Sequence, residues 1–101
     1  MLGLPETVLK LLQDYFASHP DVIKVFIYGS RAMGRENPGS DIDLALVTTS
    51  DHDISAHVKG DLEELPTPYL FDVVDYQRIT HMPLREHINR VGKVLFERHP
   101  G

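Results

Sequence analysis

The sequence predicts an α/β or α+β fold, in which a small mixed β-sheet has helices packed on it. Three observations support this prediction. Apolar residues recur at helical spacing in several segments, short runs rich in β-branched and aromatic residues lie between them, and the two kinds of segment alternate along the 101 residues. A chain of this length fits one small domain, so we expect a single domain over residues 1–101.

Residues 5–17 are expected to form the first helix and residues 22–28 the first strand. Leu9, Leu12 and Phe16 recur at helical spacing in the first segment. The second reads Val-Ile-Lys-Val-Phe-Ile-Tyr, a composition that favours extended structure. Its nearly continuous apolar character predicts burial on both faces of the sheet.

Gly29 ends this strand, and a second strand is expected over residues 41–47, which read Asp-Ile-Asp-Leu-Ala-Leu-Val. Between the two strands, residues 30–33 can open a short helix with Ser30 at or near its N-cap. Residues 37–39 read Asn-Pro-Gly, which is typical of a turn. The connection is therefore expected to be a short helix followed by a turn.

The second half of the sequence predicts two more helices and a third strand. Apolar residues at helical spacing indicate a helix over residues 54–65, and prolines follow it. Residues 69–76 are expected to form the third strand, and Pro83 opens a last helix that runs to about Arg90. Residues 91–96 fit either a short final strand or an extended tail.

The composition excludes several kinds of site. There are no cysteines, so disulfides and cysteine-ligated zinc are excluded, and the six histidines show no metal-ligand spacing and are expected at the surface. The net charge is -5 without a basic run, which argues against direct binding of nucleic acid. No signal peptide and no apolar stretch of about 18 residues is present, so a cytoplasmic protein is expected.

Asp41 and Asp43 are the first candidates for chemistry. Side chains two apart on a strand share a face, so both carboxylates should point one way while Ile42 and Leu44 point into the core. Two neighbouring carboxylates repel each other, and a divalent cation would relieve that repulsion. Oxygen ligands of this kind suit Mg²⁺ or Mn²⁺, so the pair predicts a metal site.

A third carboxylate is expected from the strand at residues 69–76, which contains Asp72 and Asp75. The two are three residues apart, so on a regular strand only one of them can face the first pair. Asp72 lies further inside the strand and is favoured, whereas Asp75 is placed to cap the following turn. Three carboxylates on neighbouring strands can hold two metal ions about 3.5–4 Å apart for displacement at phosphorus.

Gly29 and Ser30 form the expected phosphate site. A strand that ends in glycine lets the backbone approach a ligand closely, and the N–H groups of a helix start bind anions. Ser30 adds a hydroxyl donor. Arg31 is the nearest cation. Its side chain either binds phosphate or is a solvated charge at the surface, and the sequence leaves both alternatives open.

These residues resemble the signature of the DNA polymerase β-like nucleotidyltransferase superfamily. The resemblance rests on Gly29-Ser30, ten intervening residues and Asp41-Ile42-Asp43. The wider stretch of residues 28–44 reads Tyr-Gly-Ser-Arg-Ala-Met-Gly-Arg-Glu-Asn-Pro-Gly-Ser-Asp-Ile-Asp-Leu and resembles the minimal prokaryotic branch, the MNT proteins. The polymerase β-like nucleotidyltransferase fold is therefore expected.

The resemblance also implies roles for the candidate residues. Asp41 and Asp43 would bind two Mg²⁺ or Mn²⁺ ions and the nucleoside triphosphate. Asp72 would bind one of the ions and help to activate an acceptor hydroxyl. Gly29 and Ser30 would hold the β- and γ-phosphates. The implied reaction transfers a nucleoside monophosphate to a hydroxyl and releases pyrophosphate.

MNT proteins resemble the antitoxin half of HEPN/MNT toxin–antitoxin pairs, in which the MNT protein adds AMP to a tyrosine of its HEPN partner. The resemblance therefore implies an ATP-dependent adenylyltransferase that silences a HEPN-type toxin. Larger relatives carry an added helical domain without a counterpart after about residue 96, so another chain is expected to complete the site. Two alternatives stay open, an antitoxin that acts by contact alone and a nucleotidyltransferase for small molecules.

Overall fold

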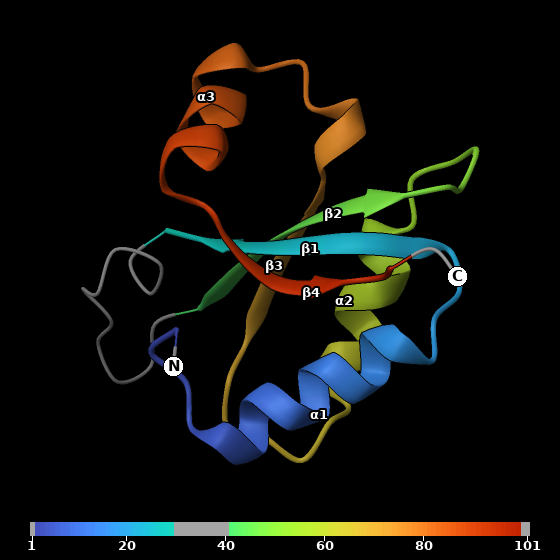
Figure 1. The fold of residues 1–101 in the computed structure, drawn as a ribbon, viewed down its shortest axis with the longest axis vertical. Helices are drawn as coiled ribbons and strands as arrows, with labels where there is room; N and C mark the ends of the chain where they lie inside the picture. The colour runs from blue at the N-terminus through green and yellow to red at the C-terminus, as the bar shows by residue number, and fades with distance from the viewer. Residues whose placement is uncertain (1, 30–40, 100–101) are drawn as a thin grey trace.

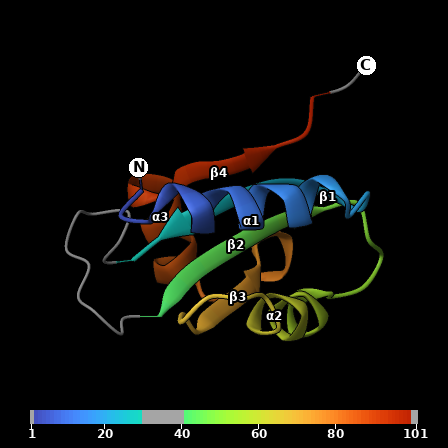
Figure 2. The same ribbon diagram turned by 90° about the horizontal axis from the view of Figure 1, so that it is seen from below.

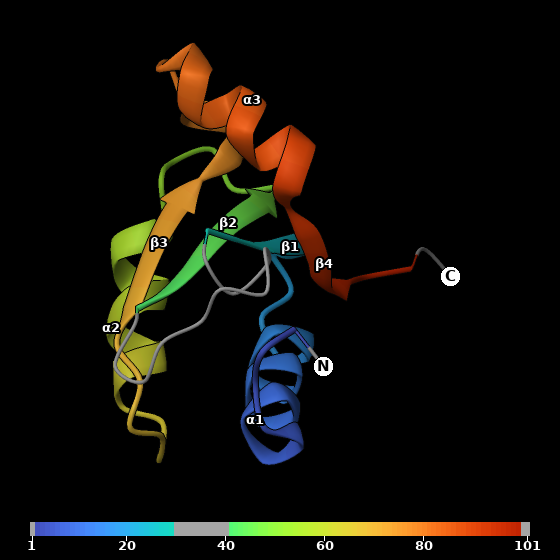
Figure 3. The ribbon, with the colours of Figure 1, turned by 90° about the vertical axis from the view of Figure 1, so that its left-hand side faces the viewer.

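The computed structural model describes residues 2–29 and 41–99 (Figure 1). Four strands form one sheet in the order β3-β2-β1-β4, in which β1 is antiparallel to β2 and β4 while β2 and β3 are parallel (Figure 3). The predicted small mixed sheet is thus confirmed. The elements in chain order are α1 (Glu6–Ala17), β1 (Val22–Tyr28), β2 (Ile42–Thr48), α2 (Ser55–Glu63), β3 (Phe71–Asp75), the 3₁₀ turn η1 (Tyr76–Arg78), α3 (Met82–Val91) and β4 (Lys93–Glu97).

Most predicted elements lie where the sequence placed them. The first helix begins at Glu6 with Pro5 as its N-cap, and β1 has the predicted bounds. The segment after α3 is a strand, since β4 pairs with β1, which decides between the two possibilities left open for it. The short helix and turn predicted between residues 30 and 40 lie outside the described residues.

Two strands differ from their predicted bounds: β2 is displaced by one residue, and β3 is shorter than predicted. β2 begins at Ile42, so Asp41 precedes the strand instead of opening it. β3 covers only Phe71–Asp75, and Tyr76 starts η1 because the Asp75 side chain accepts a hydrogen bond from the backbone N–H of Gln77 and turns the chain. The cap at Asp75 was predicted, but the end of the strand at this residue was not.

The main core lies between the sheet and the helices α1 and α2, which cover one face (Figure 2). Leu12 and Phe16 of α1 are fully buried there, as their spacing predicted. α3 packs on the opposite face (Figure 1), and its Ile88 is buried there in a smaller cluster with Tyr28 of β1 and Ala45 of β2. Burial on both faces of β1 therefore holds at Tyr28, while Lys24 and Phe26 on the less covered part are only partly buried.

The segment after β4 is tied to the end of α1 by Arg98. Its guanidinium donates hydrogen bonds to the carbonyl oxygens of Phe16 at 2.8 Å, His19 at 3.0 Å and Val22 at 3.0 Å, and it lies over the ring of Phe96. The carbonyl oxygens of Phe16 and His19 also accept hydrogen bonds from the backbone N–H groups of His19 and Val22, so Arg98 adds a second, charged donor to each of them. None of the described helices is long and apolar enough to cross a membrane.

We expect Arg98→Ala to lower the free energy of unfolding by about 2 kcal/mol, because three charge-assisted hydrogen bonds at a partly solvated site are lost. Urea denaturation followed by circular dichroism measures the change. Arg90→Ala is the control, since Arg90 is an exposed arginine near the end of α3. Equal stability of the two variants would show that the carbonyl contacts contribute nothing.

Candidate active site

The predicted carboxylates lie at the end of the sheet where β1 ends and β2 and β3 begin. Asp43 on β2 is the register partner of Tyr28 on β1 and of Asp72 on β3. Residues directly opposite each other on neighbouring strands share a face, so these three side chains form the Tyr28–Asp43–Asp72 row. Ile42 and Leu44 point to the other face and are fully buried in the main core, as predicted.

The charges of the predicted carboxylates influence one another. Burial, followed by the charges of Asp72 and Asp41, raises the pKa of Asp43 above its usual range. Burial and the charges of Asp43 and Asp72 raise the pKa of Tyr28 to about 12, so its hydroxyl stays protonated at neutral pH. The structure therefore brings the three predicted aspartates within electrostatic range of each other.

Gly29 explains how the Asp43 carboxylate is accommodated. Gly29 has a φ of 80°, in the left-handed region that favours glycine. A Cβ atom added to Gly29 would overlap the Oδ2 atom of Asp43. The group that lies close to Gly29 is thus a carboxylate of the chain itself, and the predicted approach of Gly29 to a phosphate stays a prediction. The predicted phosphate ligands Ser30 and Arg31 lie outside the described residues.

The carboxylates of Asp41, Asp43 and Asp72 are chemically suitable ligands for a divalent cation. Burial and the charges of Asp72 and Asp41 raise the pKa of Asp43, and the three carboxylates offer the oxygen ligands that Mg²⁺ and Mn²⁺ prefer, so a cation would relieve their repulsion. As the side chains are placed, no three acidic or histidine groups within residues 2–29 and 41–99 converge closely enough to hold a metal ion. The row therefore identifies candidate ligands and defines no coordination geometry.

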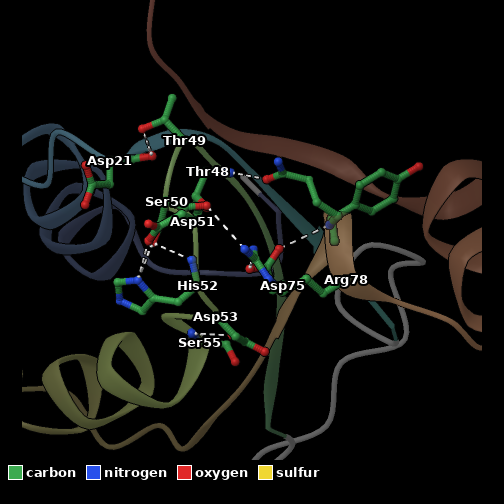
Figure 4. A network of polar contacts seen from close by, with 12 residues as sticks. Asp21, Thr48, Thr49, Ser50, Asp51, His52, Asp53, Ser55, Asp75 and Arg78 are labelled. Carbon is green, nitrogen blue, oxygen red and sulfur yellow. Dashed lines mark hydrogen bonds and ion pairs between the residues drawn. The ribbon is translucent and has the colours of Figure 1, made fainter.

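Asp75 is engaged elsewhere, on the face of β3 opposite to Asp72. Its side chain is buried, and its Oδ2 atom accepts a hydrogen bond from the Arg78 guanidinium at 2.6 Å (Figure 4). Its Oδ1 atom accepts from the backbone N–H of Gln77, whose own side chain accepts from the backbone N–H of Thr48. The role of a cap, predicted from its place near the strand end, is confirmed.

His87 is a residue that the sequence analysis assigned to the surface and that instead lies partly buried beside the row. Its ring contacts the Tyr28 ring edge to face, with the ring centres 6.3 Å apart, and its charge lowers the pKa of Asp43. The signal was present in the sequence, because Leu84, His87, Ile88 and Val91 share the spacing of one helix face. His19 is likewise partly buried, and the other four histidines are exposed.

Comparisons with known proteins agree with this geometry. Residues 10–101 match the model of the family described as polymerase beta, nucleotidyltransferase. No curated protein matches the sequence significantly. Several solved structures have a similar fold, at sequence identities that bear on the fold alone.

Three of these structures contain toxin–antitoxin pairs. A chain of the toxin-antitoxin with AMP-PNP is 23% identical with a TM-score of 0.64, over 95% of this chain and 76% of that one. A chain of the toxin-antitoxin MntA-HepT is 18% identical with a TM-score of 0.67, and the match covers 93% of this chain and 74% of that one. A chain of the tri-AMPylated Shewanella oneidensis HEPN toxin in complex with MNT antitoxin is 18% identical with a TM-score of 0.62. The match covers 89% of this chain and 73% of that one.

Proposed function

The chain belongs to the polymerase beta nucleotidyltransferase family, and from this premise we propose that it transfers AMP from ATP to a tyrosine hydroxyl of a HEPN-type partner, acting as its antitoxin. The observation that carries the proposal is the Tyr28–Asp43–Asp72 row, which places two predicted catalytic carboxylates side by side. Support for the partner comes from similar structures, among them an AMPylated HEPN toxin with its MNT antitoxin.

Asp41, Asp43 and Asp72 would hold Mg²⁺ or Mn²⁺, which when bound neutralises charge on the phosphates and polarises the reacting phosphoryl group. Gly29 would bring its backbone close to the triphosphate, beside Ser30 and Arg31. Asp43 is half-buried against Gly29, whereas Asp72 is exposed at the side of the row away from Tyr28.

That difference in exposure suits Asp72 for the acceptor. The Asp72 carboxylate would accept the proton of the acceptor hydroxyl as the hydroxyl oxygen forms a bond to the α-phosphorus. The bond from the α-phosphorus to the bridging oxygen breaks, and pyrophosphate leaves with the bonding electrons. The products are an AMP ester of the acceptor and pyrophosphate, so atoms and charge balance.

The proposal is tested by incubating the purified chain with Mg²⁺, ATP labelled in its α-phosphate and the protein encoded by the neighbouring gene. Label should appear on a tyrosine of the neighbour, and EDTA or the double variant Asp41→Asn with Asp43→Asn should abolish it. If the double variant still neutralises the neighbour fully, contact alone explains the antitoxin function. Label found only on small alcohols would instead indicate a small-molecule enzyme.

Asp72→Asn and Asp75→Asn should separate activity from stability. Asp72→Asn should reduce transfer by a factor of about 100 or more and leave the melting temperature within about 3 °C, because Asp72 is exposed and its loss removes a proton acceptor. Asp75→Asn should keep most of the activity but lower the free energy of unfolding by about 1–2 kcal/mol, because the buried carboxylate that pairs with Arg78 is lost. Initial rates and thermal melts of both variants provide the measurement, and the opposite pattern would make Asp75 the third ligand.

A further inference from the structure

The face of α3 that lies against the sheet contains one polar residue among apolar ones. Leu84, Ile88 and Val91 pack with the small cluster under α3, and His87 lies on the same helix face. A leucine at this position would pack without the desolvation cost of an imidazole. Packing by itself therefore does not explain a histidine here.

The polar edge of the His87 imidazole has no hydrogen-bond partner in the described part of the chain. Within residues 2–29 and 41–99, no group forms a hydrogen bond with either ring nitrogen, and the contact of the ring is aromatic. Its aromatic contact is with Tyr28, which is buried and leads directly into Gly29. His87 thus lies above the point where β1 ends and the backbone turns at Gly29.

A triphosphate bound at this end of the sheet would meet strong repulsion from Asp41, Asp43 and Asp72. A hydrogen-bond donor on the wall opposite the carboxylates would offset part of that repulsion and would orient the phosphates. Among the described residues, His87 is the one whose charge acts on Asp43 in the opposite sense to the neighbouring carboxylates. Because His87 lies on α3, the helix determines the side from which its imidazole approaches the carboxylates.

We propose that His87 is a nucleotide-binding residue whose imidazole N–H donates a hydrogen bond to the triphosphate of the bound nucleoside triphosphate. The inference rests on the function proposed above and adds a ligand from α3 to a site otherwise built from β1, β2 and β3. α3 then forms one wall of the nucleotide site as well as a cover for the sheet.

The test is isothermal titration of the whole chain with AMP-PNP in Mg²⁺, for the wild type, His87→Leu, His87→Gln and the control His81→Leu. His81 is exposed at the N-cap of α3, and its side chain makes no capping hydrogen bond. His81→Leu therefore makes the same substitution on the same helix, at a position outside the row. His87→Leu should raise Kd by about 10-fold to 100-fold, the value of one hydrogen bond to a charged group. His87→Gln keeps an N–H donor and should recover part of the affinity.

A purely structural role predicts another pattern. The His87→Leu variant would then bind AMP-PNP as tightly as the wild type, or the His87→Gln variant would bind it more weakly than His87→Leu. Either result overturns the inference about His87 and leaves the proposed function standing. No binding of AMP-PNP by the wild type would overturn the proposed function and the inference with it. A measurement without any variant adds to the test, because the ring nitrogen signals of His87, and not those of His81, should shift when AMP-PNP is added to the wild type.

Discussion

Asp43→Asn should abolish nucleotide transfer and at the same time raise the melting temperature of the nucleotide-free chain. The loss of activity should be about 10³-fold or more, because asparagine keeps the shape of Asp43 but removes the charge that a bound cation requires. The gain in stability follows from the electrostatics of Asp43 when EDTA removes metal ions. A carboxylate that is half-buried beside two others is held in an unfavourable state until a cation arrives.

The sign of the stability change follows from the raised pKa of Asp43. Between its pKa in the unfolded chain and its higher pKa in the folded one, the folded state binds more protons, so stability falls as the pH rises through this interval. Above the pKa of Asp43 in the folded chain, the cost of the ionised group is fully present. Asparagine does not ionise, so we expect the melting temperature to rise by roughly 2–5 °C.

Thermal melts at pH 7 in EDTA and initial rates in Mg²⁺ measure the two effects on the same preparation. Glu86→Gln is the control, since this exposed residue of α3 loses a charge away from the row and should change neither quantity. Transfer by Asp43→Asn at close to the wild-type rate would show that the carboxylate is dispensable. A lower melting temperature would show that the aspartates do not destabilise the chain when metal ions are removed.

Gly29→Ala should reduce stability and activity together. The backbone of Gly29 has a φ of 80°, which costs a residue with a Cβ about 1–2 kcal/mol. The new Cβ also overlaps the Asp43 carboxylate, and relief of that overlap requires the carboxylate or the strand end to move, at a further cost of about 1–3 kcal/mol. We expect a loss of roughly 2–5 kcal/mol in unfolding free energy and a drop in transfer rate of about 100-fold or more.

Gly60→Ala is the matched control. Gly60 lies in the middle of α2, its added Cβ would meet nothing within 4 Å, and alanine favours a helix. This variant should gain about 0.5–1 kcal/mol and keep its activity. The double variant Gly29→Ala with Asp43→Ala isolates the overlap, because removal of the carboxylate should restore the part of the stability that does not depend on φ. Equal stability of Gly29→Ala and the wild type would contradict the argument.

The sequence predicted the elements of the fold well where one periodic pattern dominated. The bounds of β1 were correct to the residue, and the buried positions of α1 followed from their spacing. The ends of β3 were less predictable, because Asp75 turns the chain through a side-chain hydrogen bond that no periodicity reveals. β4 needed the sheet itself, since its strand character is the result of pairing with β1.

For the candidate site, the sequence identified the carboxylates and Gly29 from their types and spacing. It could not show that Asp72 is the register partner of Asp43, because register is set by the packing of β2 against β3. It also missed His87, which lies 44 positions from Asp43 in the printed sequence and comes near it only through the packing of α3. The roles of Ser30 and Arg31 remain predictions, as they lie outside the described residues.

The sequence by itself determined the chemistry that this chain can offer, because Gly29, Asp41 and Asp43 are close in the chain and their spacing on a turn and a strand fixes which way they point. The tertiary structure alone decided which distant groups join them. It aligned Asp72 with Asp43 across two strands, turned Asp75 away into a cap, and brought His87 over Tyr28. The physical reason is that local geometry is encoded by neighbouring residues, whereas strand register and helix packing depend on burial of the whole core.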